Sequence, residues 1–139
     1  MKTILFADDH KSIREYCREE FEDEGYRVLL ARDGREAIQL VRQEHPDMAV
    51  LDIYMPGGTG LEALDAIKRV APAMPVVLFT AHDEACLRDR RSRLAAACVE
   101  KCADLTELKR LVFRLLASQE GPEPVRVGLP PGQPDGQRA

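Results

Sequence analysis

Short apolar runs alternate with longer amphipathic stretches along most of the chain. The runs have the length and near-continuous hydrophobicity of strands that are buried on both faces of a sheet. They lie at residues 2–7, 26–31, 48–51, 76–79 and 96–100. Between and after them, apolar residues recur at helical spacing, which predicts helices. These helices are expected at residues 12–24, 35–44, 60–71, 83–94 and 104–117.

The repeated alternation of strand and helix indicates the fold class. Short connections of this kind join parallel strands by right-handed crossovers, so that helices cover both faces of the sheet. We therefore expect a flavodoxin-like α/β fold, a doubly wound five-stranded parallel sheet with helices on both faces. In such a sheet a ligand binds beyond the carboxyl ends of the strands.

The composition changes sharply towards the C-terminus. Residues 1–118 have the pattern of one domain, whereas residues 119–139 are rich in Pro and Gly and lack any periodicity. Such a segment buries too little apolar surface to offset the entropy of ordering, which predicts a flexible tail. The tail carries no helix-turn-helix pattern, so we expect no output domain that binds DNA.

Charge and hydrophobicity exclude several classes of protein. The 139 residues carry a formal net charge of -4, which argues against a nucleic-acid-binding surface because phosphate backbones select basic faces. No apolar stretch has the length of a membrane helix, and the N-terminus lacks the pattern of a signal peptide. We therefore expect a cytoplasmic protein with no membrane or nucleic-acid partner.

The cysteines do not indicate a disulfide or a common metal motif. There are 4 of them and no CxxC pair, so we expect reduced thiols that act as small buried apolar side chains. A zinc site formed by Cys98, Cys102 and His82 is an alternative, although its ligand spacing matches no common structural zinc pattern.

Polar side chains that can carry chemistry follow four of the predicted strands. Asp8 and Asp9 follow the first strand, Asp52 the third, Thr80 the fourth and Lys101 the fifth. The carboxyl ends of parallel strands meet at one edge, so these side chains are expected to lie together. Carboxylates in one pocket repel one another unless a cation intervenes, and an all-oxygen cluster suits Mg²⁺. This predicts Asp52 as a nucleophile that forms an acyl phosphate, while Thr80 and Lys101 contact the phosphoryl oxygens.

Each of these residues also has an ordinary structural interpretation. An Asp-Asp pair after a strand is often a helix N-cap, and Asp52 alone could be an ordinary turn residue, because Asp is common in turns. Thr80 alone would suit a capping hydroxyl, and Lys101 a solvated surface charge. The site is favoured because five matching residue types each stand at the end of a predicted strand.

The chain resembles the receiver domains of two-component response regulators, in particular single-domain regulators of the chemotaxis type, up to about Ser118. The resemblance is carried by Asp8-Asp9, the segment DIYMPGGTG at 52–60, Thr80-Ala81 and Lys101. It implies that Asp52 accepts a phosphoryl group from a histidine kinase or a histidine phosphotransfer protein. It also implies a Mg²⁺ bound by Asp9, Asp52 and the backbone carbonyl of Tyr54, with Asp8 acting through a metal-bound water. Thr80 and Lys101 would contact the phosphoryl group.

Two positions depart from the receiver pattern, and both concern how the signal is passed on. The switch position three residues before the lysine usually holds Tyr or Phe, but here it is Cys98, and Cys102 replaces the Pro that usually follows the lysine. A thiol cannot sweep the surface of a large aromatic ring, so we expect the signal to be passed on weakly or from another surface. Four arginines of the fourth predicted helix are either a solvated, partly ion-paired surface or a docking surface for an acidic protein. They are Arg88, Arg90, Arg91 and Arg93.

The sequence favours a single-domain response regulator, a phosphorelay component that signals by contact with an unidentified downstream protein. Such a protein is not an enzyme, because it catalyses only its own phosphorylation and dephosphorylation. One alternative is a degenerate receiver that serves as a constitutive protein-binding module. Another is a phosphatase that works through an aspartyl phosphate, like the haloacid dehalogenases. Those enzymes carry a second Asp two residues after the nucleophile, where this chain has Tyr54.

Overall fold

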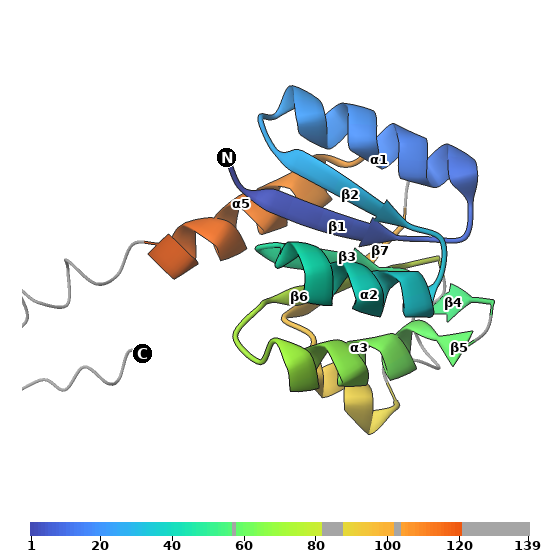
Figure 1. The fold of residues 1–139 in the computed structure, drawn as a ribbon. Coiled ribbons are helices and arrows are strands. Elements are labelled where there is room, and N and C mark those ends of the chain that lie inside the picture. The colour runs from blue at the N-terminus through green and yellow to red at the C-terminus, as the bar shows by residue number, and fades with distance from the viewer. Residues whose placement is uncertain (57, 82–87, 102–103, 121–139) are drawn as a thin grey trace, which may run out of the picture. The chain divides into compact units, whose positions relative to one another are not determined.

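A five-stranded parallel sheet forms the centre of the compact unit Met1–Leu105 (Figure 1). The computed structural model describes residues 1–56, 58–81, 88–101 and 104–120. The strands are β1 (Thr3–Ala7), β2 (Arg27–Ala31), β3 (Met48–Leu51), β6 (Val76–Thr80) and β7 (Ala97–Glu100). They pair in the order β2-β1-β3-β6-β7, and every pair is parallel. This order confirms the flavodoxin-like doubly wound α/β fold.

Helices cover both faces of this sheet, as Figure 1 shows. Helix α1 (Lys11–Asp23) lies on one face, and α2 (Gly34–Glu44) and α3 (Gly60–Val70) lie side by side on the other. Leu5 and Ala7 of β1 belong to the core under α2 and α3. Phe6, between them in sequence, points to the opposite face and packs on Phe21 of α1, with ring centroids 4.9 Å apart. The strands are therefore buried on both faces, which is why their sequences are continuously apolar.

Two helices begin at polar caps that the sequence encodes directly. The side chain of Asp33 accepts a hydrogen bond from the Glu36 amide at the start of α2. Thr59 and Glu62 form a capping box at the start of α3, in which each side chain bonds to the backbone N–H of the other residue. Caps of this kind stabilise a helix by about 1 kcal/mol each. They fix the start of both helices next to the carboxyl ends of the strands.

A short hairpin not expected from the sequence follows β3. It pairs β4 (Tyr54–Met55) with β5 (Gly58–Thr59) in antiparallel fashion and leads directly into α3. The two strands are too short for any periodicity to reveal them. The hairpin carries the chain from the end of β3 to the capping box of α3.

The predicted helix over residues 83–94 is corrected in the part that the structure describes. There the chain forms only a short 3₁₀ helix, η1 (Arg90–Leu94), and residues 82–87 lie outside the described residues. The reason is local, because the Asp89 side chain accepts a hydrogen bond from the Arg91 amide and caps a new helix start. The weak apolar face of this segment also offers little packing to extend the helix.

Helix α5 (Thr106–Glu120) belongs to a second compact unit, Thr106–Ala139. It continues three residues past the end predicted at Ala117, because Ser118, Gln119 and Glu120 carry no helix-breaking residue. Residues 121–139 lie outside the described residues, so the flexible tail predicted for 119–139 stays a prediction beyond the helix end.

Candidate functional site

Backbone hydrogen bonds align the strand ends that carry the predicted site. The amide of Asp52 donates to the carbonyl of Ala7 over 2.9 Å, which fixes the residue after β3 beside the end of β1. The amide of Lys101 donates to the carbonyl of Thr80 over 2.8 Å, which does the same for β7 and β6. These bonds extend the parallel ladder by one step beyond each strand. Residues distant in sequence are thereby brought to one edge of the sheet.

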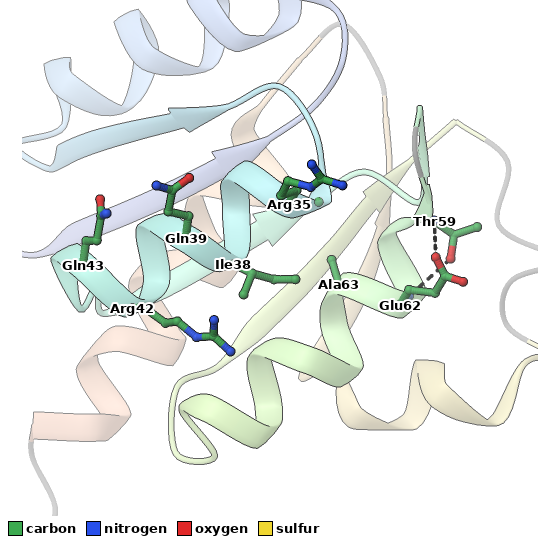
Figure 2. Close-up of a pocket in the computed structure, with 9 residues that line it drawn as sticks. Arg35, Ile38, Gln39, Arg42, Gln43, Thr59, Glu62 and Ala63 are labelled. Carbon is green, nitrogen blue, oxygen red and sulfur yellow. Dashed lines mark hydrogen bonds between the residues drawn. The ribbon is translucent and has the colours of Figure 1, made fainter.

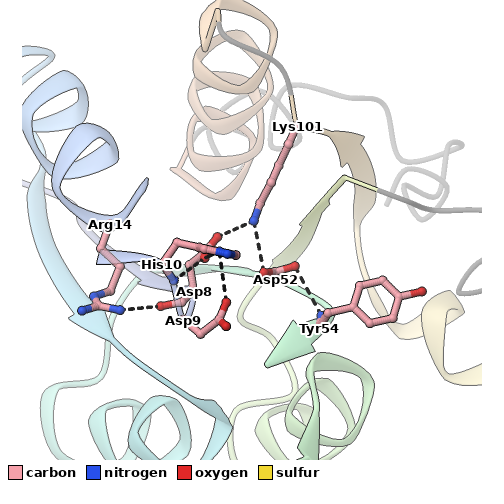
Figure 3. Close-up of polar contacts among 7 residues, drawn as sticks. All are labelled: Asp8, Asp9, His10, Arg14, Asp52, Tyr54 and Lys101. Carbon is pink, nitrogen blue, oxygen red and sulfur yellow. Dashed lines mark hydrogen bonds and ion pairs between the residues drawn. The ribbon is translucent and has the colours of Figure 1, made fainter. Parts of the chain in front are cut away.

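Lys101 links two buried carboxylates at this edge (Figure 3). Its Nζ lies 2.5 Å from Oδ2 of Asp8 and 3.1 Å from Oδ2 of Asp52. The side chains of Asp8 and Asp52 are only 6% and 5% exposed, and that of Lys101 is 14% exposed. Buried charges of this kind persist only when they are paired. Lys101 is therefore part of the site and not the solvated surface charge of the ordinary interpretation.

Burial and the neighbouring charges determine the pKa values of Asp52 and Lys101. Burial raises the pKa of the Asp52 carboxyl, and the Lys101 ammonium opposes that rise. For Lys101, burial disfavours the charged form, but the hydrogen bond and negative charge of Asp8, together with Asp52, outweigh it and raise the pKa of the lysine. Lys101 is thus held as a cation between two acidic side chains.

Asp9 and His10 form the outer rim of the site. Nδ1 of His10 lies 3.1 Å from Oδ1 of Asp8 and 3.1 Å from Oδ1 of Asp9. The carbonyl of Asp8 accepts a hydrogen bond of 2.9 Å from Arg14 in α1. The N-cap of α1 is His10, whose side chain makes no capping hydrogen bond. Asp8 and Asp9 are therefore not the N-cap residues that the ordinary interpretation supposes.

The loop after β3 closes around Asp52. The amide of Tyr54 donates to Oδ1 of Asp52 over 3.3 Å, while the phenol ring points away from the carboxylates (Figure 3) and the residue is 50% exposed. Gly60, the first residue of α3, packs so tightly on this loop that a Cβ at its position would lie 2.1 Å from the Asp52 carbonyl oxygen. The glycine therefore allows α3 to begin directly against the backbone of Asp52.

The two remaining predicted residues lie on the strands beside the site. Thr80 is the last residue of β6 and is fully buried. Cys98 lies on β7 opposite Leu78, is partly buried, and packs against the core under α2 and α3. Cys102 lies outside the described residues.

A group of oxygen and nitrogen atoms within the described residues has the spacing of metal ligands. Asp8, Asp9, His10 and Asp52 each offer one ligand atom, and these atoms lie within 4.8 Å of one another. The three carboxylates supply the hard oxygen donors that suit Mg²⁺. His10 was not among the residues singled out from the sequence, although its place directly after Asp8-Asp9 was a signal for it. The predicted site residues thus fit a divalent cation.

A separate groove lies between α2 and α3 and has a volume of about 530 Å³ (Figure 2). It contains none of the predicted site residues. Its floor is formed by Ile38 and Ala63, and its rim is polar. The lining residues are Gly34, Arg35, Ile38, Gln39, Arg42, Gln43, Thr59, Glu62 and Ala63. The carboxylate cluster is therefore distinct from this groove.

The sequence profile of the response regulator receiver domain matches residues 4–113. The chain belongs to the receiver domain family of response regulators. Among curated proteins, the receiver is 39% identical over 114 residues to "Response regulator MprA" of Mycolicibacterium vanbaalenii, an alignment that covers 82% of this chain and 48% of MprA. The chain therefore spans about half the length of the curated relatives it matches.

Solved structures of receivers have the same fold as this chain. The response regulator TrrA of Thermotoga maritima, crystallised in complex with Mg²⁺-BeF, is 36% identical and superposes with a TM-score of 0.79, covering 83% of this chain and 99% of TrrA. TrrA in complex with the histidine kinase ThkA gives 37% identity and a TM-score of 0.76, with 84% of this chain and 99% of that chain covered. These matches confirm the receiver fold that the sequence predicted.

The remaining expectations from the sequence have mixed outcomes. None of the helices in the described ranges is long and apolar enough to cross a membrane. Of the predicted zinc ligands, His82 and Cys102 lie outside the described residues, so that alternative stays a prediction. Arg91 is paired with Asp89, with Nη2 2.8 Å from Oδ2, as expected for a partly ion-paired surface. The other arginines of that segment are exposed.

Proposed function

We propose that this receiver accepts a phosphoryl group on Asp52 from a histidine kinase or a histidine phosphotransfer protein, in a reaction that requires Mg²⁺. The observation that carries the proposal is the pairing of Lys101 with the buried carboxylates of Asp8 and Asp52. In the transfer, the P–N bond of a phosphohistidine breaks and a P–O bond to the Asp52 carboxylate forms.

The carboxylate cluster supplies the metal site for this reaction. Asp9 and Asp52, with the backbone carbonyl of Tyr54, would hold the cation directly, and Asp8 would hold it through a water. A bound Mg²⁺ neutralises negative charge on the phosphoryl oxygens. The oxygen donors of the cluster fit this cation, and the TrrA structure was solved with Mg²⁺-BeF.

Lys101 and Thr80 prepare the site for the charge of the phosphoryl group. The Lys101 ammonium is already within 3.1 Å of Asp52, and the carboxylates around it raise its pKa and hold it charged. A cation placed in advance stabilises negative charge without reorganisation during the reaction. Thr80 ends β6 at the same edge, and we assign its hydroxyl as a hydrogen-bond donor to a phosphoryl oxygen.

The protein is in this proposal a regulator and not an enzyme for other substrates, so it catalyses only its own phosphorylation and dephosphorylation. The phosphatase alternative needs an acid–base carboxylate two residues after Asp52. That position holds Tyr54, whose side chain is directed away from the site. No feature of the described residues favours the phosphatase.

The output of the domain is a contact with a downstream protein in the cytoplasm, without nucleic acid or membrane as a partner. Cys98 packs against the core as a small side chain, so we propose that the signal does not pass through an aromatic switch at this position. The curated relatives are about twice as long as the matched segment, and the single-domain arrangement stays a prediction.

Binding of a phosphoryl mimic tests the site. Beryllium fluoride imitates a phosphoryl group on a carboxylate, so the combination of Mg²⁺ and beryllium fluoride is expected to raise the melting temperature of the wild type. Asp52→Asn should show no such rise, while the surface variant Asp65→Asn should behave as the wild type. A rise in melting temperature without Mg²⁺, or one that survives in Asp52→Asn, would contradict the proposal.

A further inference from the structure

His10 lies in the mouth of the carboxylate cluster with its ring nitrogen directed inward. Nδ1 is 3.1 Å from Oδ1 of both Asp8 and Asp9 (Figure 3). The His10 side chain is 62% exposed, and both of these ring contacts are to carboxylates of the cluster. The position of the ring is set by the acidic side chains and by the backbone of its own residue.

The backbone of His10 is fixed on both sides. Its amide donates to Oδ1 of Asp8 over 2.9 Å, and its carbonyl accepts from the amides of Ile13 and Arg14 over 3.1 and 3.0 Å in the first turn of α1. Arg14 also holds the carbonyl of Asp8. The Cα of His10 therefore has a defined place beside the cluster, and its side chain reaches the cluster without a change of backbone.

The ligand atoms of His10 and of the two direct carboxylate ligands, Asp9 and Asp52, are close enough to share one ion after a small adjustment. They lie within 4.8 Å of one another, whereas atoms bound to one ion at about 2.0–2.2 Å lie at most roughly 4.4 Å apart. The difference is a few tenths of an ångström, and the side chains of His10 and Asp9, which are 62% and 31% exposed, have room to adjust by that amount.

We propose that His10 is a fourth protein ligand at this site and that it raises the affinity of the receiver for borderline transition cations, such as Co²⁺ or Ni²⁺, without changing its affinity for Mg²⁺. The inference rests on the metal site of the proposed function and adds a ligand to it. Mg²⁺ prefers an all-oxygen shell, whereas imidazole nitrogen suits the later transition metals, whose affinity for mixed N and O sites is higher. His10 is therefore expected to raise the affinity for Co²⁺ and Ni²⁺ and to leave the affinity for Mg²⁺ unchanged.

An imidazole between two carboxylates could also be only their ion-pair partner. A structural ion pair and a metal ligand differ in how their removal changes the affinity for different cations. A residue that only holds the loop affects every cation to the same extent. A ligand affects the transition metals and leaves Mg²⁺ unchanged. The ratio of the two affinities therefore distinguishes a ligand from a structural partner.

The test is calorimetric titration of Co²⁺ and of Mg²⁺ into the full chain as wild type, His10→Asn and His45→Asn. His45 is an exposed histidine at the left-handed C-cap of α2 (φ 50°), where asparagine is tolerated, so this variant is a matched control. We expect the wild type to bind Co²⁺ more tightly than Mg²⁺. In His10→Asn the Kd for Co²⁺ should rise roughly tenfold or more, with the Kd for Mg²⁺ within about twofold.

The visible spectrum of bound Co²⁺ gives a second readout, because replacing a nitrogen ligand by oxygen changes it. Circular dichroism verifies that His10→Asn is folded, and His10→Gln takes its place if it is not. Equal weakening of both cations, unchanged Co²⁺ binding, or a wild type without preference for Co²⁺ would each overturn the inference. Labelling of the same variants by acetyl phosphate with Mg²⁺ separates the two proposals. A wild type that is labelled while His10→Asn binds Co²⁺ normally refutes only the inference, whereas an unlabelled wild type refutes the proposed function.

Discussion

At the scale of single residues, Lys101 compensates part of the negative charge that is buried at the acidic site. It places one positive charge between the carboxylates of Asp8 and Asp52, which are nearly completely buried. With Asp9 on the rim, three carboxylates face a single lysine, so the site keeps an excess of negative charge. This excess favours the binding of a divalent cation.

Cys17 is a buried neighbour of this charged group. Its thiol is 1% exposed, and burial, with a further contribution from the charge of Asp8, raises the pKa of the thiol to about 12. It lines a small cavity with Phe79 and Lys101. The thiol is therefore protonated throughout the neutral range and behaves as a small apolar side chain.

This pKa predicts how stability depends on alkaline pH. The unfolded thiol ionises near 9.0, whereas the folded thiol resists ionisation up to about 12. The folded pKa is raised, so the contribution of Cys17 is complete below pH 9 and is lost as the pH rises towards 12. Between about pH 8 and pH 10.5, we expect the advantage of wild type over Cys17→Ala in the free energy of unfolding to shrink by about 2 kcal/mol.

Urea unfolding of both proteins at the two pH values measures this change. The comparison cancels the titration of the other groups, because they are shared by both proteins. A difference between wild type and variant that does not depend on pH would mean that the Cys17 thiol is not shielded as the structure indicates.

At the scale of elements, the start of α3 positions Asp52. The hairpin of β4 and β5 leads into the capping box of Thr59 and Glu62, and the amide of Gly60 donates to the carbonyl of Ile53 over 2.7 Å. The helix thereby begins directly against the backbone of Asp52. The loop that carries Asp52 is held between β3 and α3.

Gly60→Ala should disrupt this packing. The new Cβ would lie 2.1 Å from the carbonyl oxygen of Asp52 and 2.8 Å from the Cα of Ile53, both of them backbone atoms that cannot rotate away. We expect a loss of at least roughly 1–3 kcal/mol in the free energy of unfolding, measured by urea unfolding. Gly34→Ala at the start of α2 is the matched control, because its Cβ meets only the Ala63 methyl at 3.2 Å. It should change stability by less than about 1 kcal/mol, and similar losses in both variants would contradict the account.

The elements that the sequence predicted well are those with a long apolar pattern. All five strands of the sheet and the helices α1, α2 and α3 were expected within a few residues of their bounds, because buried strands and amphipathic helices leave strong periodic signals. The hairpin of β4 and β5 has two residues in each strand and leaves no such signal. In the 83–94 segment, the local cap from Asp89 starts a short 3₁₀ helix, which competes with the longer helix that the pattern predicted.

The site was predictable for a different reason. Asp8, Asp52 and Lys101 follow strands that are parallel, and parallel strands with their carboxyl ends at one edge are what the alternation of strands and helices predicts. The direction of the His10 side chain was not predictable, because it depends on the turn in which the Asp8 side chain accepts the His10 amide. A turn of that kind leaves no periodic pattern in the sequence.

At the scale of the whole molecule, one edge of the sheet gathers the chemistry of the receiver. The strands β1, β3 and β7 deliver two acidic residues and the lysine to that edge from positions up to 93 residues apart in sequence. The family match and the TrrA structures agree with this arrangement. The central claim is therefore that the residues at this edge act together in the Mg²⁺-dependent phosphorylation of Asp52.

The measurement that tests this claim most directly is the intact mass of the protein after incubation with acetyl phosphate. It compares wild type and Asp52→Asn, each with and without Mg²⁺. The account predicts a gain of one phosphoryl group in the wild type that depends on Mg²⁺ and is absent from Asp52→Asn. A wild type that gains no mass, or an Asp52→Asn variant that is labelled as fully as the wild type, would contradict it.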